Sequence, residues 1–297
     1  MNFCKILAAT LTLTLTLAGT ALAAPPWKAP TPGNFLVSTR VAIIEFTPQG
    51  TLVQSIVPPR PPDATSIADI SAVMCSDRGE LYAVVAHHIA GSPFKQAQLW
   101  IANAENTSGK YFPLPPLSHS YRTAQLELVD KDRIAVRLEC DAYLVALDDG
   151  EAVELPYAEC LQVAGDRFLI SERDERGVST IKVYAGETFA VENKIGLPPW
   201  NTRFAASKTE KAIYIVTGRE IQKLDWQGKP LKKYLIPPAE QASFHSPQAF
   251  HNGDLAVQNR SGKIFTFDKN LKPIGTSTIS LKRSDQILSI TAVPSSR

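Results

Sequence analysis

The sequence predicts an all-β fold made of repeated four-stranded units that close into a ring. Two observations support this: an aliphatic residue followed by proline recurs along the chain, and a hairpin pattern precedes each recurrence. The 22 prolines among 297 residues leave little room for long helices, because proline interrupts the helical hydrogen-bond ladder. Hydrophobic residues make up 44% of the chain and charged residues 20%, which is a globular composition and excludes wholesale disorder.

The recurring prolines have the spacing of repeated β-units. The first proline of each recurrence is Pro58, Pro115, Pro156, Pro198 or Pro237. After a longer first interval they lie about 40 residues apart, and repeats of about 40 to 45 residues built from short strands are typical of β-propeller blades. Proline suits the end of an outermost strand, where no further ladder donor is needed. A β-sandwich with accidental proline spacing is the alternative.

Each proline follows two short strands joined by a tight turn. Alternating apolar residues predict half-buried strands, and glycine or asparagine in the turn supplies the left-handed conformation. The strands that precede these turns cover residues 41–46, 142–147, 180–184, 221–225 and 263–268. A second strand pair lies upstream of most of these hairpins, so each repeat is expected to hold four strands.

Counting these repeats gives a closed ring. Five complete units begin near Asp69, Arg122, Glu159, Arg203 and His245. One strand remains at the C-terminal end, over residues 287–293, and three remain at the N-terminal end, over residues 35–38, 41–46 and 52–57. Together they make a sixth unit, which joins the chain ends and removes exposed sheet edges. We therefore predict a single six-bladed β-propeller domain over residues 34–297, with four antiparallel strands in each blade.

Two segments resemble a known superfamily. Residues 221–236 and 264–274 are similar to repeats of the six-bladed propellers that include NHL-repeat and TolB-like propellers, and the hairpin form apolar-x-x-apolar-Asp-x-x-Gly-Lys stands at Ile221–Lys229. The resemblance implies the architecture and no particular member. The related lactonase and gluconolactonase families hold calcium through carboxylates and asparagines. The corresponding positions here do not form that set, so their activity is not carried over.

The N-terminal residues have the pattern of a signal peptide. A short segment with one lysine precedes an apolar stretch, and Ala21-Leu22-Ala23 offers small residues for cleavage, so residues 1–23 are expected to be removed. An uncleaved anchor is the alternative, but threonines dilute the apolar stretch. We expect a periplasmic or secreted protein with no membrane span after cleavage. Residues 24–33 are expected to form an extended lead-in outside the core.

Three cysteines remain after cleavage, and an exported protein can form disulfides. Cys140 is expected to end a second strand and Cys160 to begin the next innermost strand, so both should lie on one face. We predict a Cys140–Cys160 disulfide, and a buried free thiol at Cys75 midway along an innermost strand.

Candidate ligand-binding residues come from the loops that lead into the innermost strands, because these loops surround one mouth of the ring. Convergent polar and aromatic groups around a concavity are typical of ligand sites. The alternative is that these residues are polar only because the loops are solvated. Arg122 and Arg203 flank Glu159 and are expected to steer an anionic ligand or to pair with that carboxylate. The candidates are Asp69, Arg122, Glu159, Arg203, His245, Asp285, Tyr121, Tyr157 and Trp200.

A metal site and an inserted loop are weaker candidates. Asp69, His245 and Asp285 fall on three adjacent blades and offer two carboxylates and an imidazole for a divalent metal such as calcium. A longer first repeat places His87 and His88 at the start of a predicted loop over residues 86–98. Adjacent histidines in a strand point to opposite sides, which makes them a poor chelate, and a solvated histidine pair is the alternative.

Two functions from different classes fit this reading. The first is an exported, monomeric binding module without a catalytic residue, which holds a small molecule or a partner protein on its loops. The second is a metal-dependent hydrolase of the lactonase type. A net charge of +2, from 31 basic and 29 acidic residues, gives no basic field for nucleic acid. The fold does not decide between binding and catalysis. The arrangement of the loop residues is therefore needed to distinguish the two functions.

Overall fold

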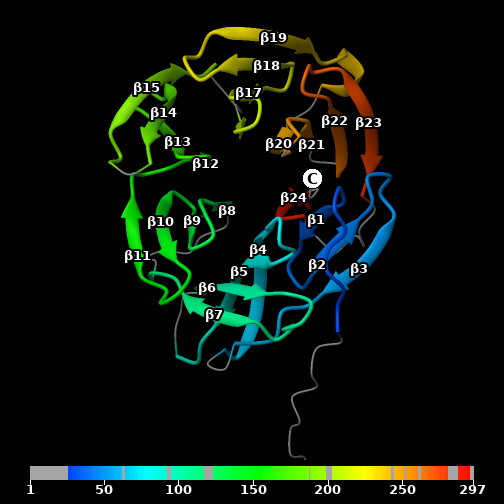
Figure 1. Ribbon diagram of the computed structural model, residues 1–297, viewed down its shortest axis with the longest axis vertical. Coiled ribbons are helices and arrows are strands. Elements are labelled where there is room, and N and C mark those ends of the chain that lie inside the picture. The colour runs from blue at the N-terminus through cyan, green and yellow to red at the C-terminus, as the bar shows by residue number, and fades with distance from the viewer. Residues whose placement is uncertain are drawn as a thin grey trace, which may run out of the picture.

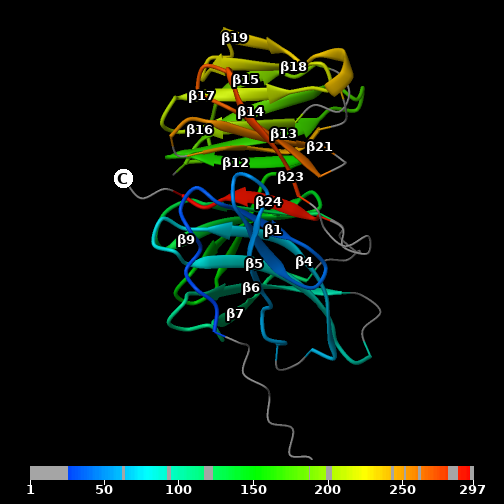
Figure 2. The ribbon, with the colours of Figure 1, turned by 90° about the vertical axis from the view of Figure 1, so that its right-hand side faces the viewer.

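The computed structural model forms a ring of six four-stranded sheets, seen along its shortest axis in Figure 1 and from the side in Figure 2. It describes residues 26–61, 64–91, 95–116, 123–186, 188–198, 203–241, 244–250, 252–259, 262–279 and 287–294. The described elements are 24 strands and one short 3-10 helix, Pro238–Glu240. The predicted six-bladed, all-β propeller is confirmed.

The blades are numbered here from the one that holds both chain ends. Blade 1 contains β24(Ser289–Ala292), β1(Phe35–Ser38), β2(Ile43–Phe46) and β3(Leu52–Ile56). Blade 2 contains β4(Ser66–Cys75), β5(Leu81–His88), β6(Gln96–Ala102) and β7(Lys110–Pro113). Blade 3 contains β8(Ala124–Leu128), β9(Arg133–Leu138), β10(Asp141–Ala146) and β11(Ala152–Leu155).

The other three blades follow in chain order. Blade 4 contains β12(Cys160–Ala164), β13(Arg167–Arg173), β14(Ser179–Ala185) and β15(Val191–Gly196). Blade 5 contains β16(Arg203–Ser207), β17(Ala212–Val216), β18(Glu220–Asp225) and β19(Pro230–Leu235). Blade 6 contains β20(Phe244–Ala249), β21(Leu255–Asn259), β22(Lys263–Phe267) and β23(Pro273–Thr278).

The antiparallel order gives the ring two distinct faces. The connections into each innermost strand, and those between second and third strands, lie on one face, named here the loop face. The turns between first and second strands, and between third and fourth strands, lie on the opposite face, named here the turn face. Of the predicted site residues that the structure describes, Tyr157 and Glu159 lie in the connection into β12 on the loop face, and Arg203 begins β16 on the same face.

Burial follows the position of a strand within its blade. The second strands β17 and β21 are buried at every position, because neighbouring blades cover both of their sides. The outermost strands β19 and β23 are mostly exposed. A continuous run of apolar residues is therefore typical of the second strand of a blade, and alternation of buried and partly exposed residues is typical of the third strand, as in β18.

A repeated turn joins the third and fourth strands. The Asp225 carboxylate accepts hydrogen bonds from the backbone N–H groups of Gln227 and Lys229, at 3.0 and 2.8 Å, and Gly228 takes a φ of 83°. The equivalent turn of blade 6 uses Asp268 in the same way, but buried Leu271 holds the left-handed conformation, with a φ of 60°. The aspartate therefore fixes this turn even where glycine is replaced.

The ring closes by pairing the two ends of the chain, as predicted. Strand β1 pairs antiparallel with β24, from Phe35 opposite Ala292 to Ser38 opposite Ser289. Strand β24 also contacts the innermost strands β4 and β20 of the neighbouring blades. The lead-in differs from the prediction, because Trp27 is buried in the apolar core between blades 1 and 2. Buried Glu45 anchors the same segment by accepting a hydrogen bond from the Thr31 backbone N–H at 2.7 Å.

The inner edges of the blades are linked from one blade to the next by side chains. Gln125 of β8 accepts a hydrogen bond from the Leu161 N–H of β12 at 3.2 Å and donates to the Leu161 carbonyl oxygen. Gln162 of β12 accepts from the Ala206 N–H of β16 at 3.1 Å. These side chains satisfy backbone groups of innermost strands that have no further strand to pair with.

The predicted loop over residues 86–98 is shorter than expected. Strand β5 continues to His88 and β6 begins at Gln96, so the extra length of this repeat lies in longer strands. His87 is fully buried, while His88 is exposed. The two histidines point to opposite sides because they are neighbours in a strand. The prediction of a solvated histidine pair is therefore wrong for His87.

Candidate functional site

The described candidate residues lie partly in the predicted entry loops and partly within the innermost strands. Asp69 is in β4, Tyr157 and Glu159 precede β12, and Arg203 begins β16. Arg122, Tyr121, Trp200 and Asp285 lie outside the described residues. His245 is in β20, but its side chain is not among those described. The site is therefore built from blades 2 to 5.

A cluster of polar side chains gathers around Arg137 at the loop face of blades 3, 4 and 5. Its members come from strand ends that meet on this face: β8 and β12 begin here, and β9 ends here. They interact through hydrogen bonds or through the charges of Arg137 and Arg203. We name this group the Arg137 cluster: Gln125, Arg137, Cys140, Tyr157, Cys160 and Arg203.

Neutral oxygen atoms hold the Arg137 guanidinium. Its Nε–H donates to the Gln125 side-chain oxygen at 3.3 Å, and a terminal N–H donates to the Glu139 carbonyl oxygen. Among the described residues, no carboxylate lies within ion-pair distance of it. Burial lowers the pKa of Arg137, and the positive charge of Arg203 lowers it further, whereas Cys160, Cys140 and Glu139 raise it. The cluster therefore holds a desolvated positive charge next to a second one.

The two cysteines of the cluster differ from the prediction. Cys140 and Cys160 are free thiols in the structure, and the predicted disulfide between them is not formed. Each thiol interacts with a different side chain: Cys140 affects the pKa of the Tyr157 hydroxyl, and Gln125 affects the pKa of Cys160. Cys75 is a buried free thiol, as expected, although it ends β4 instead of lying midway along it.

Thiol ionisation in the cluster is disfavoured. Burial raises the pKa of Cys160 and outweighs the opposing effect of Arg137 and Arg203. The hydrogen bond with Cys140 and burial raise the pKa of Tyr157 to about 12. Because the thiolate is the reactive form of cysteine, the protonated Cys160 is a poor nucleophile.

The carboxyl group of Glu127 lies on β8, two residues after Gln125. Burial raises the pKa of Glu127 to about 8, against hydrogen bonds from the Gln125 side chain and the Val163 backbone that lower it. Gln162 donates to the same carboxyl group at 2.6 Å. Glu127 is therefore mostly protonated at neutral pH, and its charge does not cancel that of Arg137.

The predicted pairing of Glu159 with an arginine takes a different form. The Glu159 carboxylate contacts the Arg173 guanidinium of β13 at 3.2 Å. Both side chains are solvated, so the pair contributes little to stability. Arg173 was not predicted because it belongs to a neighbouring strand of the same blade, whereas Arg122 and Arg203 are the sequence neighbours in adjacent blades.

Asp69 is engaged by a cation of the protein itself. Its carboxylate contacts the Lys95 ammonium at 2.7 Å and accepts a hydrogen bond from Ser71 at 2.5 Å. A metal ion at Asp69 would lie beside that ammonium, which opposes its binding. Within the described ranges, no three His, Cys, Asp or Glu side chains converge as metal ligands. Since the His245 and Asp285 side chains are not described, the predicted metal site stays a prediction.

Buried His87 lacks hydrogen-bond partners. Neither ring nitrogen of His87 has a partner among the described residues, and neither does the buried Gln98 side-chain oxygen. His87 is opposite Gln96, and Gln98 is opposite Val85, so both unsatisfied groups lie on the side of blade 2 that faces blade 1. The rest of that side is apolar.

Sequence reasoning missed Gln125, Glu127 and Arg137 because they lie inside strands. A signal for them exists: Glu127 stands between Leu126 and Leu128, and Arg137 stands between Val136 and Leu138. A charged residue in an apolar strand has to meet a compensating group. The identity of that group depends on the neighbouring blade. In the described part of the chain, no helix has both the length and the apolar composition that crossing a bilayer requires.

Comparison with known proteins relates this chain to others by fold. No protein family matches the sequence, and no curated protein does. The WD40 domain of Neurospora crassa Pan2 aligns with a TM-score of 0.51 and 13% identity, over 89% of this chain and 80% of that chain. A Bacteroides caccae protein of unknown function aligns with a TM-score of 0.53 and 12% identity, over 88% of this chain and 98% of that chain. A chain of the mitotic checkpoint complex aligns with a TM-score of 0.53 and 12% identity, over 78% of this chain and 70% of that chain. At these identities the similarity concerns the propeller fold alone and identifies no subtype.

Proposed function

We propose that this protein is a binding module that holds an anionic group of a small ligand at the Arg137 cluster. The observation that carries the proposal is the state of Arg137, whose guanidinium is partly buried, bonded to neutral oxygens and not paired with a carboxylate among the described residues. A guanidinium has five N–H donors in a planar fork that matches carboxylate and phosphate oxygens. Two of these donors are used by Gln125 and Glu139, and the other three have no partner among the described residues, which makes them available to a ligand.

Electrostatics supports an anion over a cation or a neutral group. Burial lowers the pKa of Arg137, and the positive charge of Arg203 lowers it further. A bound anion favours the charged form of Arg137, because it interacts favourably with both positive charges in a partly desolvated place. The raised pKa of Glu127 keeps this carboxyl group, which is on the same strand as Gln125, largely uncharged. Tyr157 adds an aromatic surface beside the cluster, and such side chains concentrate binding energy.

Binding is favoured over catalysis by the thiols. A cysteine hydrolase needs a thiolate and a base that activates it. Burial raises the pKa of Cys160, and the nearby Glu127 raises it further, so the thiol stays protonated despite the opposing charges of Arg137 and Arg203. For the metal-dependent hydrolase, the only candidate ligand with a described side chain, Asp69, is paired with Lys95. No observation favours that second function.

Export and subtype are further parts of the proposal. The signal-peptide pattern of residues 1–23 supports a periplasmic or secreted protein. The Ile221–Lys229 hairpin supports placing it near the NHL-repeat and TolB-like propellers. Fractionation of the producing cells and sequencing of the mature N-terminus test export. We expect a first residue of Ala24, and an intact Met1 in the cytoplasm would contradict it.

A titration with small anions tests the site. Citrate and phosphate are added to the purified protein, and binding is measured by calorimetry and by the shift in melting temperature. We expect Arg137→Gln to abolish binding and Arg137→Lys to weaken it, because lysine keeps the charge but loses the planar fork. Arg133→Gln is the matched control, since Arg133 is on the same strand but at the turn face, paired with Asp130 at 2.7 Å. Equal loss in both glutamine variants, or no binding by the unmodified protein, would overturn the proposal.

A further inference from the structure

A cavity of about 690 Å³ lies between blades 4 and 5, at the turn face. Its walls come from the turn before β13, from β14 and β15, and from the turns that follow β16 and β18. It is therefore separate from the Arg137 cluster, which is at the loop face. Its size falls in the range of small-molecule sites, about 300 to 1,000 Å³.

The cavity exists because the side chains of Leu169 and Val183 are short compared with those at the equivalent positions of the next blade. In blade 4, Leu169 of β13 is opposite Val183 of β14, and in blade 5, Tyr214 of β17 is opposite Lys223 of β18. Leu169 and Tyr214 are each the third residue of the second strand of their blade, counted from the turn face. The two positions are equivalent, since each of Val183 and Lys223 is followed by a register shift against the outermost strand. Val183 lines the cavity.

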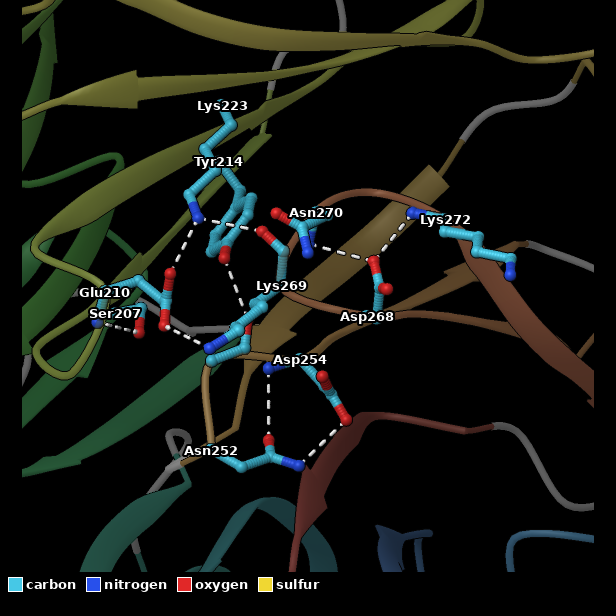
Figure 3. A network of polar contacts seen from close by, with 11 residues as sticks. Ser207, Glu210, Tyr214, Lys223, Asn252, Asp254, Asp268, Lys269, Asn270 and Lys272 are labelled. Atoms are coloured by element: carbon cyan, nitrogen blue, oxygen red, sulfur yellow. Dashed lines mark hydrogen bonds and ion pairs between the residues drawn. The ribbon is translucent and has the colours of Figure 1, made fainter.

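The junction between blades 5 and 6 shows what the longer side chains do (Figure 3). The Tyr214 hydroxyl donates to the Gly253 carbonyl oxygen at 2.8 Å. The Lys223 ammonium donates to the Lys269 carbonyl oxygen at 2.8 Å and contacts Glu210 at 2.9 Å. Tyr214 is 0% exposed and Lys223 is 7% exposed. These side chains fill the space that stays open one junction earlier.

The junction between blades 4 and 5, which contains the cavity, also has a hydrogen bond from a side chain to a backbone carbonyl oxygen of the next blade. The donor of this bond is on the outermost strand of its blade, whereas Lys223 is on the third strand. Trp226 occupies the turn position that Lys269 occupies in blade 6, one residue after the turn aspartate. Its carbonyl oxygen accepts a hydrogen bond from the Asn193 side chain of β15 at 3.0 Å. Because Asn193 is on the strand outside Val183, the space beneath it is left empty.

The lining has an apolar surface and an excess of positive charge. The Trp226 ring is half-buried and packs against the core between the two blades. Arg167 is paired with Glu192 at 2.8 Å and with Asp166 at 3.4 Å, which accounts for both carboxylates. Lys208 and Lys211 line the cavity and have no ion pair among the described residues. The lining therefore combines a half-buried indole with two ammonium groups that have no ion pair in the described part of the chain.

We propose that this cavity binds an acidic saccharide of the uronic-acid type. The indole of Trp226 offers a flat apolar surface for the face of a sugar ring, and Lys208 and Lys211 offer cations for its carboxylate. The carboxylate–guanidinium row of Glu192, Arg167 and Asp166 presents alternating acceptors and donors for hydroxyl groups. An aromatic acid would use the ring and the cations but would leave this polar row without partners, which costs binding energy.

The experiment uses the trisaccharide of galacturonic acid, with its methyl ester as the uncharged control, and benzoate as the aromatic acid. Binding to the full mature chain is followed by calorimetry and by tryptophan fluorescence. We expect the acid to bind and its ester to bind at least about tenfold more weakly, a difference of about 1.4 kcal/mol. The difference should shrink as salt is added, because exposed charges are screened.

Matched variants locate the site. The Lys208→Ala, Lys211→Ala double variant should lose about tenfold in affinity for the acid but not for the ester. Lys229→Ala is the control, because Lys229 follows the same turn as Trp226 but does not line the cavity. Val183→Phe should abolish binding of both forms by filling the space, and Arg133→Gln, which lies outside both proposed sites, should leave it unchanged. Absence of acid binding, tighter binding of benzoate, or equal binding of acid and ester would overturn the proposal.

Discussion

The junctions on the two sides of blade 5 have the same backbone and opposite interiors. Between blades 5 and 6, Tyr214 and Lys223 reach across to backbone carbonyl groups and fill the space. Between blades 4 and 5, Leu169 and Val183 occupy the equivalent positions, and a cavity of about 690 Å³ is left. A propeller thus tolerates a hollow junction where a polar bond farther out, here from Asn193, still ties the blades together.

The largest effect is expected from opening the filled junction. Tyr214→Leu places in blade 5 the residue that blade 4 has, removes the bond to Gly253 and leaves a void. We expect the free energy of unfolding to fall by about 2 to 3 kcal/mol, from lost packing and an unsatisfied carbonyl group. Urea denaturation measures this. A change below about 0.5 kcal/mol would show that the junction tolerates a void as well as its neighbour does.

A pH titration extends the comparison to the junction between blades 3 and 4, where Glu127 is the buried acid. Its pKa is about 8 in the folded protein and 4.5 ordinarily. Between these values the folded state binds one proton more than the unfolded state, so stability should fall as pH rises, by at most about 1.4 kcal/mol per pH unit. Glu127→Gln cannot ionise and should flatten the profile. Parallel profiles for the two proteins over pH 5 to 8 would contradict the buried acid.

His87 tests whether every buried polar group at a junction has a structural role. It is 0% exposed and faces blade 1, and neither of its ring nitrogens has a hydrogen-bond partner in the part of the chain that the structure describes. Replacing it by leucine removes a desolvation cost, so we expect His87→Leu to raise the free energy of unfolding by about 1 kcal/mol. Thermal and urea denaturation at pH 7.5 measure this. Destabilisation by a similar amount would mean that the imidazole has a bonded partner in solution.

The smallest effect is expected from filling the hollow junction. Val183→Phe adds volume where the cavity has room, so overpacking is absent and the gain in buried apolar surface offsets the lost side-chain entropy. We expect the free energy of unfolding to change by less than about 0.5 kcal/mol. Val136→Phe is the control, because buried Val136 lies in the packed core between blades 2 and 3 and should not accept a larger ring. Equal destabilisation by both would show that the cavity is closed in solution.

The fold was predictable because its signals are local. Alternation, second strands that are apolar throughout, and turns such as Asp225–Lys229 each occupy a few consecutive residues and recur at a fixed spacing. The candidate site was predictable only in part. Tyr157 and Glu159 were found because they lie in a loop, and Arg203 because it begins a strand next to a loop; polar residues are readily noticed at such positions. Arg137 and Glu127 were missed because their partners belong to other strands and blades.

The errors have the same origin. The predicted Cys140–Cys160 disulfide placed both residues on one face, which is where they are, but both are free thiols in the structure, because spacing along the sequence does not fix the direction of a side chain. Glu159 pairs with Arg173 on the next strand of its blade, a contact set by register and not by loop order. Sequence spacing locates a residue around the ring and leaves its side-chain partners open.

The pairing of β1 with β24 has a consequence for how the chain is made. Ser38 and Ser289, whose hydroxyl groups are 2.7 Å apart, are separated by 251 residues. Strands β1 to β3 are therefore synthesised first but stay an incomplete sheet with one open edge until the last segment arrives. Contacts between such distant segments form slowly, and open strand edges promote aggregation. Blade 1 is the point at which a growing or translocating chain most needs a chaperone to cover its edge.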